Sequence, residues 1–188
     1  MHKFDIEKAD LLESEERYKM LPPDEILDKI GVREGMVIAD VGCGTGFFAI
    51  PASRILGNEG QVYAFDIESK MLTLLRMRLE KSNVVPIVSE ESKLPLKDKL
   101  LDLTLMAFVL HEAVDLDAML TEGKRVLKHK GKLVIIDWIK QSEDIGPPRD
   151  ERLDQADIVN WLKNQDFDIE LSEMLNDSHY LVVATVNH

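Results

Sequence analysis

Apolar positions along the chain fall into two patterns that alternate in order. Apolar runs with many β-branched residues predict strands at 36–40, 61–65, 84–88, 101–108 and 133–138. Apolar residues three and four positions apart predict helices between them, at 47–56, 68–81 and 116–127. Strands that alternate with helices form a mostly parallel sheet covered on both faces. The pattern therefore predicts an α/β fold, a Rossmann-like doubly wound sheet.

Both ends of the chain extend this core. Residues 1–21 are expected to form a helical segment, with a helix at 9–20 that is either a lid over the site, through Arg17 and Tyr18, or an ordinary surface helix. Pro22-Pro23-Asp24 starts a further helix. After a helix at 155–164, runs at 167–173 and 180–186 predict a hairpin. We expect one domain, 1–188, with seven strands, all parallel except one antiparallel strand of the C-terminal hairpin.

The first strand leads into Asp40-Val41-Gly42-Cys43-Gly44-Thr45-Gly46, and a helix is expected to start near Thr45. Glycines permit positive φ and let a ligand approach the backbone, and a helix start presents free N–H groups. A dinucleotide fingerprint can be placed on Gly44, Gly46 and Ala49, with Asp66 following. An acid before the first glycine instead suits a ligand with an ammonium group, such as S-adenosylmethionine. We favour S-adenosylmethionine, with an NAD(P)-dependent oxidoreductase as an alternative.

Composition narrows the partners and the compartment. The formal net charge of −12 over 188 residues argues against nucleic acid or an anionic membrane as a main partner. Cys43 is the single cysteine, so neither an intrachain disulfide nor a thiolate zinc site can form, and no metal is expected. Without a signal-peptide core or a membrane-spanning run, the expected location is the cytoplasm. The oligomeric state stays open.

Several of these landmarks, in their order, resemble the class I S-adenosylmethionine-dependent methyltransferases of the small ubiquinone/menaquinone-methyltransferase-like group. The resemblance runs from about Pro22 to the C-terminus. It implies that Asp66 holds the ribose hydroxyls, that Glu90 takes the place of an acid that contacts adenine, and that Phe108 lies beside the sulfonium. The cofactor-binding residues that we expect on this basis are Asp40, Gly42, Gly44, Gly46, Asp66, Glu90 and Phe108. The loop at 146–148, with Arg149 or Arg152, resembles a substrate-side element.

The resemblance implies methyl transfer, and departures from other methyltransferase types point to a small-molecule acceptor. The fourth strand does not end in the Asn/Asp-Pro-Pro-aromatic motif of enzymes that methylate planar nitrogens, and a single cysteine does not suit arsenite. His111 is the candidate general base, with a packed or capping histidine as its alternative. Glu112 and Asp137 are weaker candidates because strand-end acids often only cap helices. A non-catalytic subunit that binds S-adenosylmethionine is the rival reading. Four methionines are expected to fill the core: Met71, Met77, Met106 and Met119.

Overall fold

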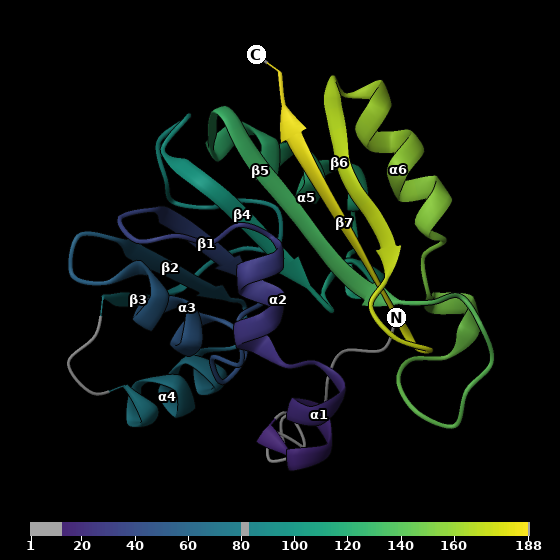
Figure 1. The fold of residues 1–188 in the computed structure, drawn as a ribbon, viewed down its shortest axis with the longest axis horizontal. Coiled ribbons are helices and arrows are strands. Elements are labelled where there is room, and N and C mark those ends of the chain that lie inside the picture. Colours follow the sequence, from purple (N-terminus) through teal and green to yellow (C-terminus); the bar gives the residue numbers. More distant parts are fainter. Residues whose placement is uncertain (1–12, 80–82, 188) are drawn as a thin grey trace.

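The computed structural model describes residues 13–79 and 83–187, which build one seven-stranded sheet of order β3-β2-β1-β4-β5-β7-β6 (Figure 1). The strands are β1 (Val37–Val41), β2 (Gln61–Asp66), β3 (Val84–Val88), β4 (Leu101–Ala107), β5 (Leu127–Trp138), β6 (Phe167–Met174) and β7 (His179–Val186). Strands β1 to β5 pair in parallel, whereas β7 pairs antiparallel with both β5 and β6. The predicted fold class is confirmed, including the single antiparallel strand.

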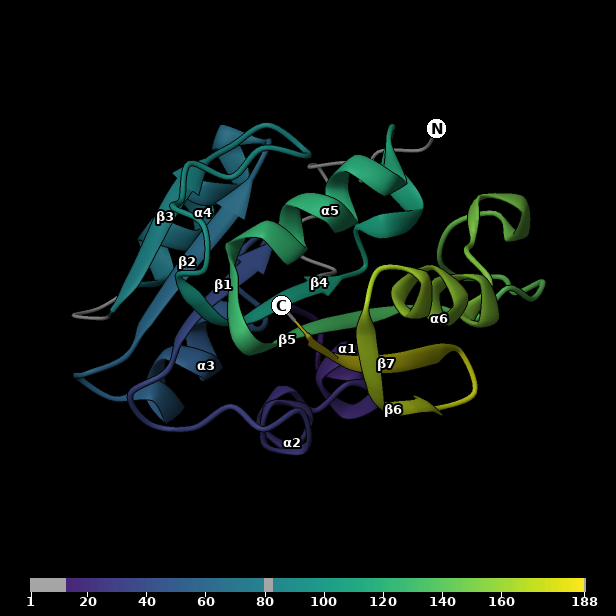
Figure 2. The same ribbon diagram turned by 90° about the horizontal axis from the view of Figure 1, so that it is seen from above.

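Helices cover both faces of this sheet (Figure 2). The helices are α1 (Glu15–Met20), α2 (Pro23–Lys29), α3 (Ala49–Leu56), α4 (Ser69–Arg78), α5 (Leu116–Val126) and α6 (Gln155–Asn164), with short 3-10 turns η2 (Leu110–Glu112) and η3 (Arg149–Glu151). Apolar side chains of α2, α3 and α4 pack together on one face, and those of α5 and α6 pack on the other. Asp115 and Asp154 cap the N-termini of α5 and α6 by accepting backbone N–H bonds.

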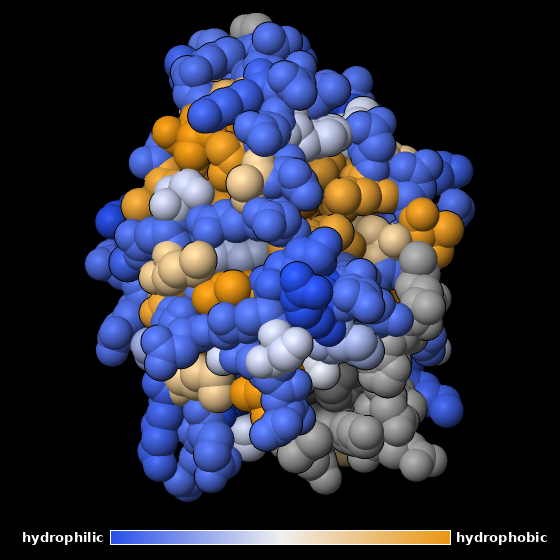
Figure 3. Space-filling model, turned by 90° about the vertical axis from the view of Figure 1, so that its right-hand side faces the viewer, coloured by the Kyte–Doolittle hydropathy of each residue, from blue (hydrophilic) through white to orange (hydrophobic). Residues whose placement is uncertain are grey.

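Central strands of a covered sheet are buried on both faces, which explains their continuous apolar runs. Leu133 to Ile136 of β5 are all fully buried, and so are Leu181 and Val182 of β7. The side of the molecule that carries α6 is mostly hydrophilic, with apolar side chains scattered among polar ones (Figure 3). Within the residues that the structure describes, no helix is both long and apolar enough to cross a bilayer.

Some expectations about single elements were wrong. Strand β5 begins at Leu127, directly after α5, and not at residue 133 as expected. Lys130, with a φ of 63°, lies at an irregularity inside this strand, where the pairing with β4 shifts register. Met77 is 79 % exposed and not in the core. The inner face of α4 is set by Met71, Leu72 and Leu75, and a residue two positions after Leu75 points away from it.

Within the described residues, two helices begin later than expected. Helix α1 begins at Glu15, where the side chain of Ser14 accepts a hydrogen bond from the Arg17 N–H at 3.3 Å. The beginning of the predicted helix, residues 9–12, lies outside the described residues. Helix α3 begins at Ala49, not near Thr45, because Gly46, with a φ of 96°, cannot be part of a right-handed helix. The glycine loop is therefore longer than the sequence suggested.

Candidate active site

A cavity of about 550 Å³ opens at the carboxyl ends of β1 and β4, where the strand order reverses. Ligands of open α/β sheets bind at such a switch point. The wall of the cavity contains seven of the residues expected from the sequence: Asp40, Gly42, Gly44, Asp66, Glu90, Phe108 and His111. Glu90 lies on this wall with its side chain 78 % exposed, in an ion pair with Lys93 at 3.9 Å.

The three glycines of the loop have positive φ values of 72° at Gly42, 53° at Gly44 and 96° at Gly46, which only glycine adopts without strain. Two of them are also required by packing. A Cβ on Gly42 would lie 2.8 Å from Cγ2 of Val109, and one on Gly46 would lie 2.5 Å from Cδ1 of Leu75. Gly46 thus packs against Leu75, whereas Gly42 and Gly44 line the cavity.

Two carboxylates flank this loop. Asp40 is 3 % exposed, and its Oδ2 has no hydrogen-bond partner among residues 13–79 and 83–187. Burial raises the pKa of Asp40 to about 7. The charge of Asp66 adds to this rise in pKa, whereas a hydrogen bond from the Ala49 backbone opposes it. Asp66 accepts hydrogen bonds from the N–H groups of Gly44 at 2.9 Å and Glu68 at 2.8 Å. Burial also raises the pKa of Asp66, although these N–H groups oppose the rise.

Helix α1 covers the glycine-loop end of the cavity. The guanidinium of Arg17 lies 4.2 Å from the ring centre of Phe47 and 5.5 Å from that of Phe108, and the Tyr18 ring packs on Phe47 with centres 4.8 Å apart. Burial lowers the pKa of Arg17 to about 10, which leaves the guanidinium charged at neutral pH. Glu13 connects α1 to the glycine loop, because it accepts hydrogen bonds from the Tyr18 and Thr45 hydroxyls and from Arg78.

An aromatic wall follows strand β4. Phe108 has a φ of 60°, which is strained for a bulky residue and is typical of functional positions. This backbone turns the Phe108 ring toward Trp138 at 6.0 Å and toward the His179 ring at 5.1 Å, measured between centres. Trp138 and His179 pack at 4.3 Å, and all three rings line the cavity. This side of the cavity is therefore lined by aromatic rings that are inclined to one another.

His111 and Asp137 form a hydrogen-bonded pair beside this wall. The Nδ1 atom of His111 lies 2.7 Å from Oδ1 of Asp137, a residue that is 1 % exposed, and the other carboxylate oxygen accepts the His111 backbone N–H at 3.3 Å. Burial works against the imidazolium, but the hydrogen bond and charge of Asp137, with the charges of Glu112 and Glu151, outweigh burial and raise the pKa of His111. Asp137 thus orients the His111 ring and also accepts a backbone N–H of the short helix η2.

A second histidine, His179, lines the same cavity and is 1 % exposed. Its Nδ1 lies 2.9 Å from Oδ1 of Asn176, an oxygen that also accepts the backbone N–H groups of Ser178 and His179. Burial lowers the pKa of His179 to about 4. The imidazole is therefore neutral at neutral pH. No motif in the sequence pointed to this residue.

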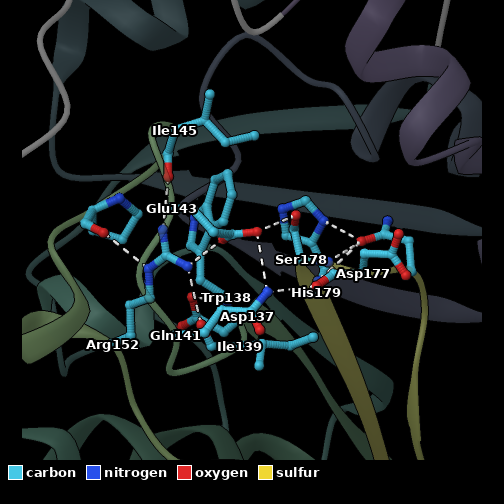
Figure 4. A network of polar contacts seen from close by, with 12 residues as sticks. Asp137, Trp138, Ile139, Gln141, Glu143, Ile145, Arg152, Asp177, Ser178 and His179 are labelled. Atoms are coloured by element: carbon cyan, nitrogen blue, oxygen red, sulfur yellow. Dashed lines mark hydrogen bonds and ion pairs between the residues drawn. The ribbon is translucent and has the colours of Figure 1, made fainter.

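Arg152 fastens the loop between β5 and α6, which forms the far wall (Figure 4). The side chain is 1 % exposed and donates to the carbonyl oxygens of Pro147 at 2.9 Å, Ile139 at 3.0 Å and Ile145 at 2.7 Å. It also forms an ion pair with Glu143. Of the two arginines singled out in the sequence, Arg152 thus has a structural position, whereas Arg149 is exposed with its side chain at 57 %.

The model of the methyltransferase domain family matches residues 39–135, more than half of the chain. Over 126 residues the chain is 36 % identical to the ubiquinone/menaquinone biosynthesis C-methyltransferase of Laribacter hongkongensis, covering 66 % of this chain and 52 % of that protein. The corresponding enzyme of Shewanella halifaxensis is 35 % identical over 123 residues, covering 63 % of this chain and 49 % of that protein. The chain therefore spans about half the length of these curated relatives.

A solved structure matches the chain over nearly its whole length. The S-adenosylmethionine-dependent methyltransferase from Aquifex aeolicus is 33 % identical, with a TM-score of 0.91, and the match covers 98 % of this chain and 100 % of that one. The motif from Asp40 to Gly46 begins at the start of the region that the family model matches. By this match and by its fold, the chain belongs to the class I S-adenosylmethionine-dependent methyltransferases.

Proposed function

We propose that the chain transfers the methyl group of S-adenosylmethionine to a small-molecule acceptor, with His111 as the general base. The observation that carries this proposal is one cavity shared by the glycine loop and the His111 side chain, whose partner Asp137 is buried behind it. Its volume of about 550 Å³ lies within the range of roughly 300–1,000 Å³ that small-molecule sites occupy.

The chain's own groups fit the cofactor at two points. The unpartnered, buried Oδ2 of Asp40 is an acceptor that an ammonium group would satisfy. Each carboxylate oxygen of Asp66 accepts one backbone N–H and keeps acceptor capacity for the two hydroxyls of a ribose. The alternating glycines bring the backbone close to such a ligand. These contacts support the assignment of Asp40, Gly42, Gly44 and Asp66 to cofactor binding, with Glu90 and Phe108 at the edges of the same site.

When bound, S-adenosylmethionine supplies a methyl group activated by its sulfonium. An acceptor that received this methyl group would give up one proton. The chain holds the acceptor in place and excludes water, through Phe108 and Trp138. The Nε2 atom of His111 takes the proton, because Nδ1 is held by Asp137 and the raised pKa makes the imidazole a better base.

The acceptor is proposed to be a small molecule with a flat apolar part. The aromatic wall of Phe108, Trp138 and His179 supports this, and so does similarity to relatives whose names specify ubiquinone and menaquinone biosynthesis. Within the described cavity wall, Arg17 is the only lysine or arginine, and its guanidinium already packs on Phe47 and Phe108. This composition does not favour a highly anionic acceptor.

Two measurements test the proposal. Titration calorimetry should show binding of S-adenosylmethionine and S-adenosylhomocysteine, and far weaker binding of NAD. Incubation with tritiated S-adenosylmethionine and a cell metabolite extract should label a small product that mass spectrometry identifies. Preferential NAD binding would overturn the cofactor assignment. If both the chain and its His111→Ala variant bind the cofactor tightly and neither gives a labelled product, the chain is better described as a non-catalytic subunit that binds S-adenosylmethionine.

A further inference from the structure

The turn between β6 and β7 fixes which nitrogen of His179 carries the proton. The side-chain amide of Asn176 donates from Nδ2 to the carbonyl oxygen of Met20 at 3.0 Å, so its Oδ1 must be the acceptor toward His179. An acceptor oxygen at 2.9 Å requires a proton on Nδ1 of His179. The second ring nitrogen, Nε2, is then unprotonated and can only accept a hydrogen bond.

That acceptor has no donor in the part of the chain that the structure describes. Nε2 of His179 is buried and without a hydrogen-bond partner, although the ring lies among the cavity-lining residues. The Trp138 ring packs against the His179 ring at a tilt of 54°, and Phe108 meets it edge to face. In Figure 4, a dashed line joins one nitrogen of the His179 ring to the turn that precedes β7. A buried acceptor left unsatisfied is unfavourable, and such atoms in native proteins usually have a ligand or water partner.

We propose that Nε2 of His179 accepts a hydrogen bond from an O–H or N–H group of the methyl acceptor. His179 would then be a specificity-determining residue of the acceptor site. The inference rests on the proposed function and narrows its substrate class to molecules with such a donor beside a flat ring. A site built to satisfy a hydrogen-bonding group rejects analogues that lack it, because the protein atom is then left unpaired.

The two histidines of the cavity have different roles in this scheme. Burial, together with the positive charges of Arg17 and Arg152, keeps the pKa of His179 low even though Glu143 and Asp137 oppose this effect. His179 therefore stays neutral and does not take the proton that is lost during methyl transfer. His111, whose pKa is raised beside Asp137, is the group that takes it.

Phenol and anisole provide matched probes, since both carry one flat ring and only phenol has an O–H donor. Titration calorimetry at neutral pH, with the chain saturated by S-adenosylhomocysteine, should show phenol binding about tenfold more tightly than anisole. His179→Phe keeps an aromatic ring but removes the acceptor, so the preference should disappear. His129→Phe, at an exposed position of β5, is the control and should retain it.

Nitrogen NMR of the chain with ¹⁵N-labelled histidine gives a readout that needs no variant. The Nε2 resonance of His179 should show an unprotonated nitrogen at neutral pH, and phenol should shift it toward the protonated range whereas anisole should not. Equal binding of the two probes, as a resident water on Nε2 would give, overturns the proposal. So does a preference that survives His179→Phe, or absence of phenol binding. Binding of S-adenosylhomocysteine in the same titrations reports separately on the proposed function.

Discussion

The buried carboxyl of Asp40 makes the stability of the fold depend on pH, and Asp40→Asn should remove that dependence. The pKa of Asp40 is raised from 3.8 to about 7, mainly because burial disfavours the ionised form. The unfolded chain loses this proton near 3.8 and the folded chain only near 7. Between these values the unfolded state binds fewer protons, so the free energy of unfolding falls as the pH rises.

The rise in pKa corresponds to about 4 kcal/mol once the pH is above 7, lost at about 1.4 kcal/mol per pH unit between 3.8 and 7. An asparagine amide does not ionise. Below the unfolded-state pKa, the protonated carboxyl and the amide are both neutral, and the two proteins should have similar stability. Above pH 7 the variant should be more stable by up to about 4 kcal/mol. The gain carries a functional cost, since an amide at this position would offer no charge to a cofactor ammonium.

Urea unfolding of both proteins at several pH values measures this directly. We expect the difference in free energy of unfolding to widen steadily from about pH 5 to about pH 7 and then to level off. Asp157→Asn, at an exposed position of α6, is the control and should follow the parent chain. Stability curves that run parallel across this range would refute the reasoning, as would an Asp40→Asn variant that is less stable above pH 7.

Three further substitutions test the site and the loop. Asp66→Ala should weaken S-adenosylmethionine binding by about 10–100-fold in calorimetry, through loss of a charge-assisted contact, whereas Asp157→Ala should not; normal binding would place the ribose elsewhere. His111→Ala should lower kcat by about 10²–10⁴ with cofactor affinity unchanged, and His129→Ala should leave kcat as it is; a loss seen only in stability would mean that His111 merely packs. Gly46→Ala should reduce the free energy of unfolding by about 2–5 kcal/mol, because its φ is positive and the added Cβ would meet Leu75. Gly35→Ala should reduce it by only about 1–2 kcal/mol, because φ is also positive there but the added Cβ would meet nothing within 4 Å. Equal losses at the two glycines would contradict the packing argument.

The parts of the site that the sequence predicted are those that local sequence determines. The acid and alternating glycines of residues 40–46 follow a buried strand, and Asp66 ends the next one, so both must lie at the carboxyl edge of a parallel sheet. Periodicity also located α6 and β3 with their bounds as observed. Met77 was wrongly placed in the core because it is apolar. Whether an apolar residue of α4 is buried depends on which face of the helix it occupies, and Met77 is on the exposed face.

The parts that were missed depend on contacts between distant segments. His179 is the first residue of β7, and a strand that runs antiparallel begins at the edge where the parallel strands end. That position is a signal that sequence reasoning could have used, once the hairpin was predicted. The pairing of Asp137 with His111 spans 26 residues, and nothing in the spacing of either residue indicates it. Arg152 was misjudged for a similar reason. The sequence placed it in a loop on the substrate side, but its side chain is buried and holds that loop by hydrogen bonds to loop carbonyl oxygens.

Unfavourable local features gather at this cavity. Asp40 is a buried carboxyl without a full set of partners, Phe108 has a backbone conformation that disfavours its side chain, and His179 has an unsatisfied acceptor. Such sites persist where a ligand supplies what the fold lacks. An ammonium group at Asp40 and a hydrogen-bond donor at His179 would satisfy two of them. The stability that these positions lack is, on this argument, recovered when cofactor and acceptor bind together.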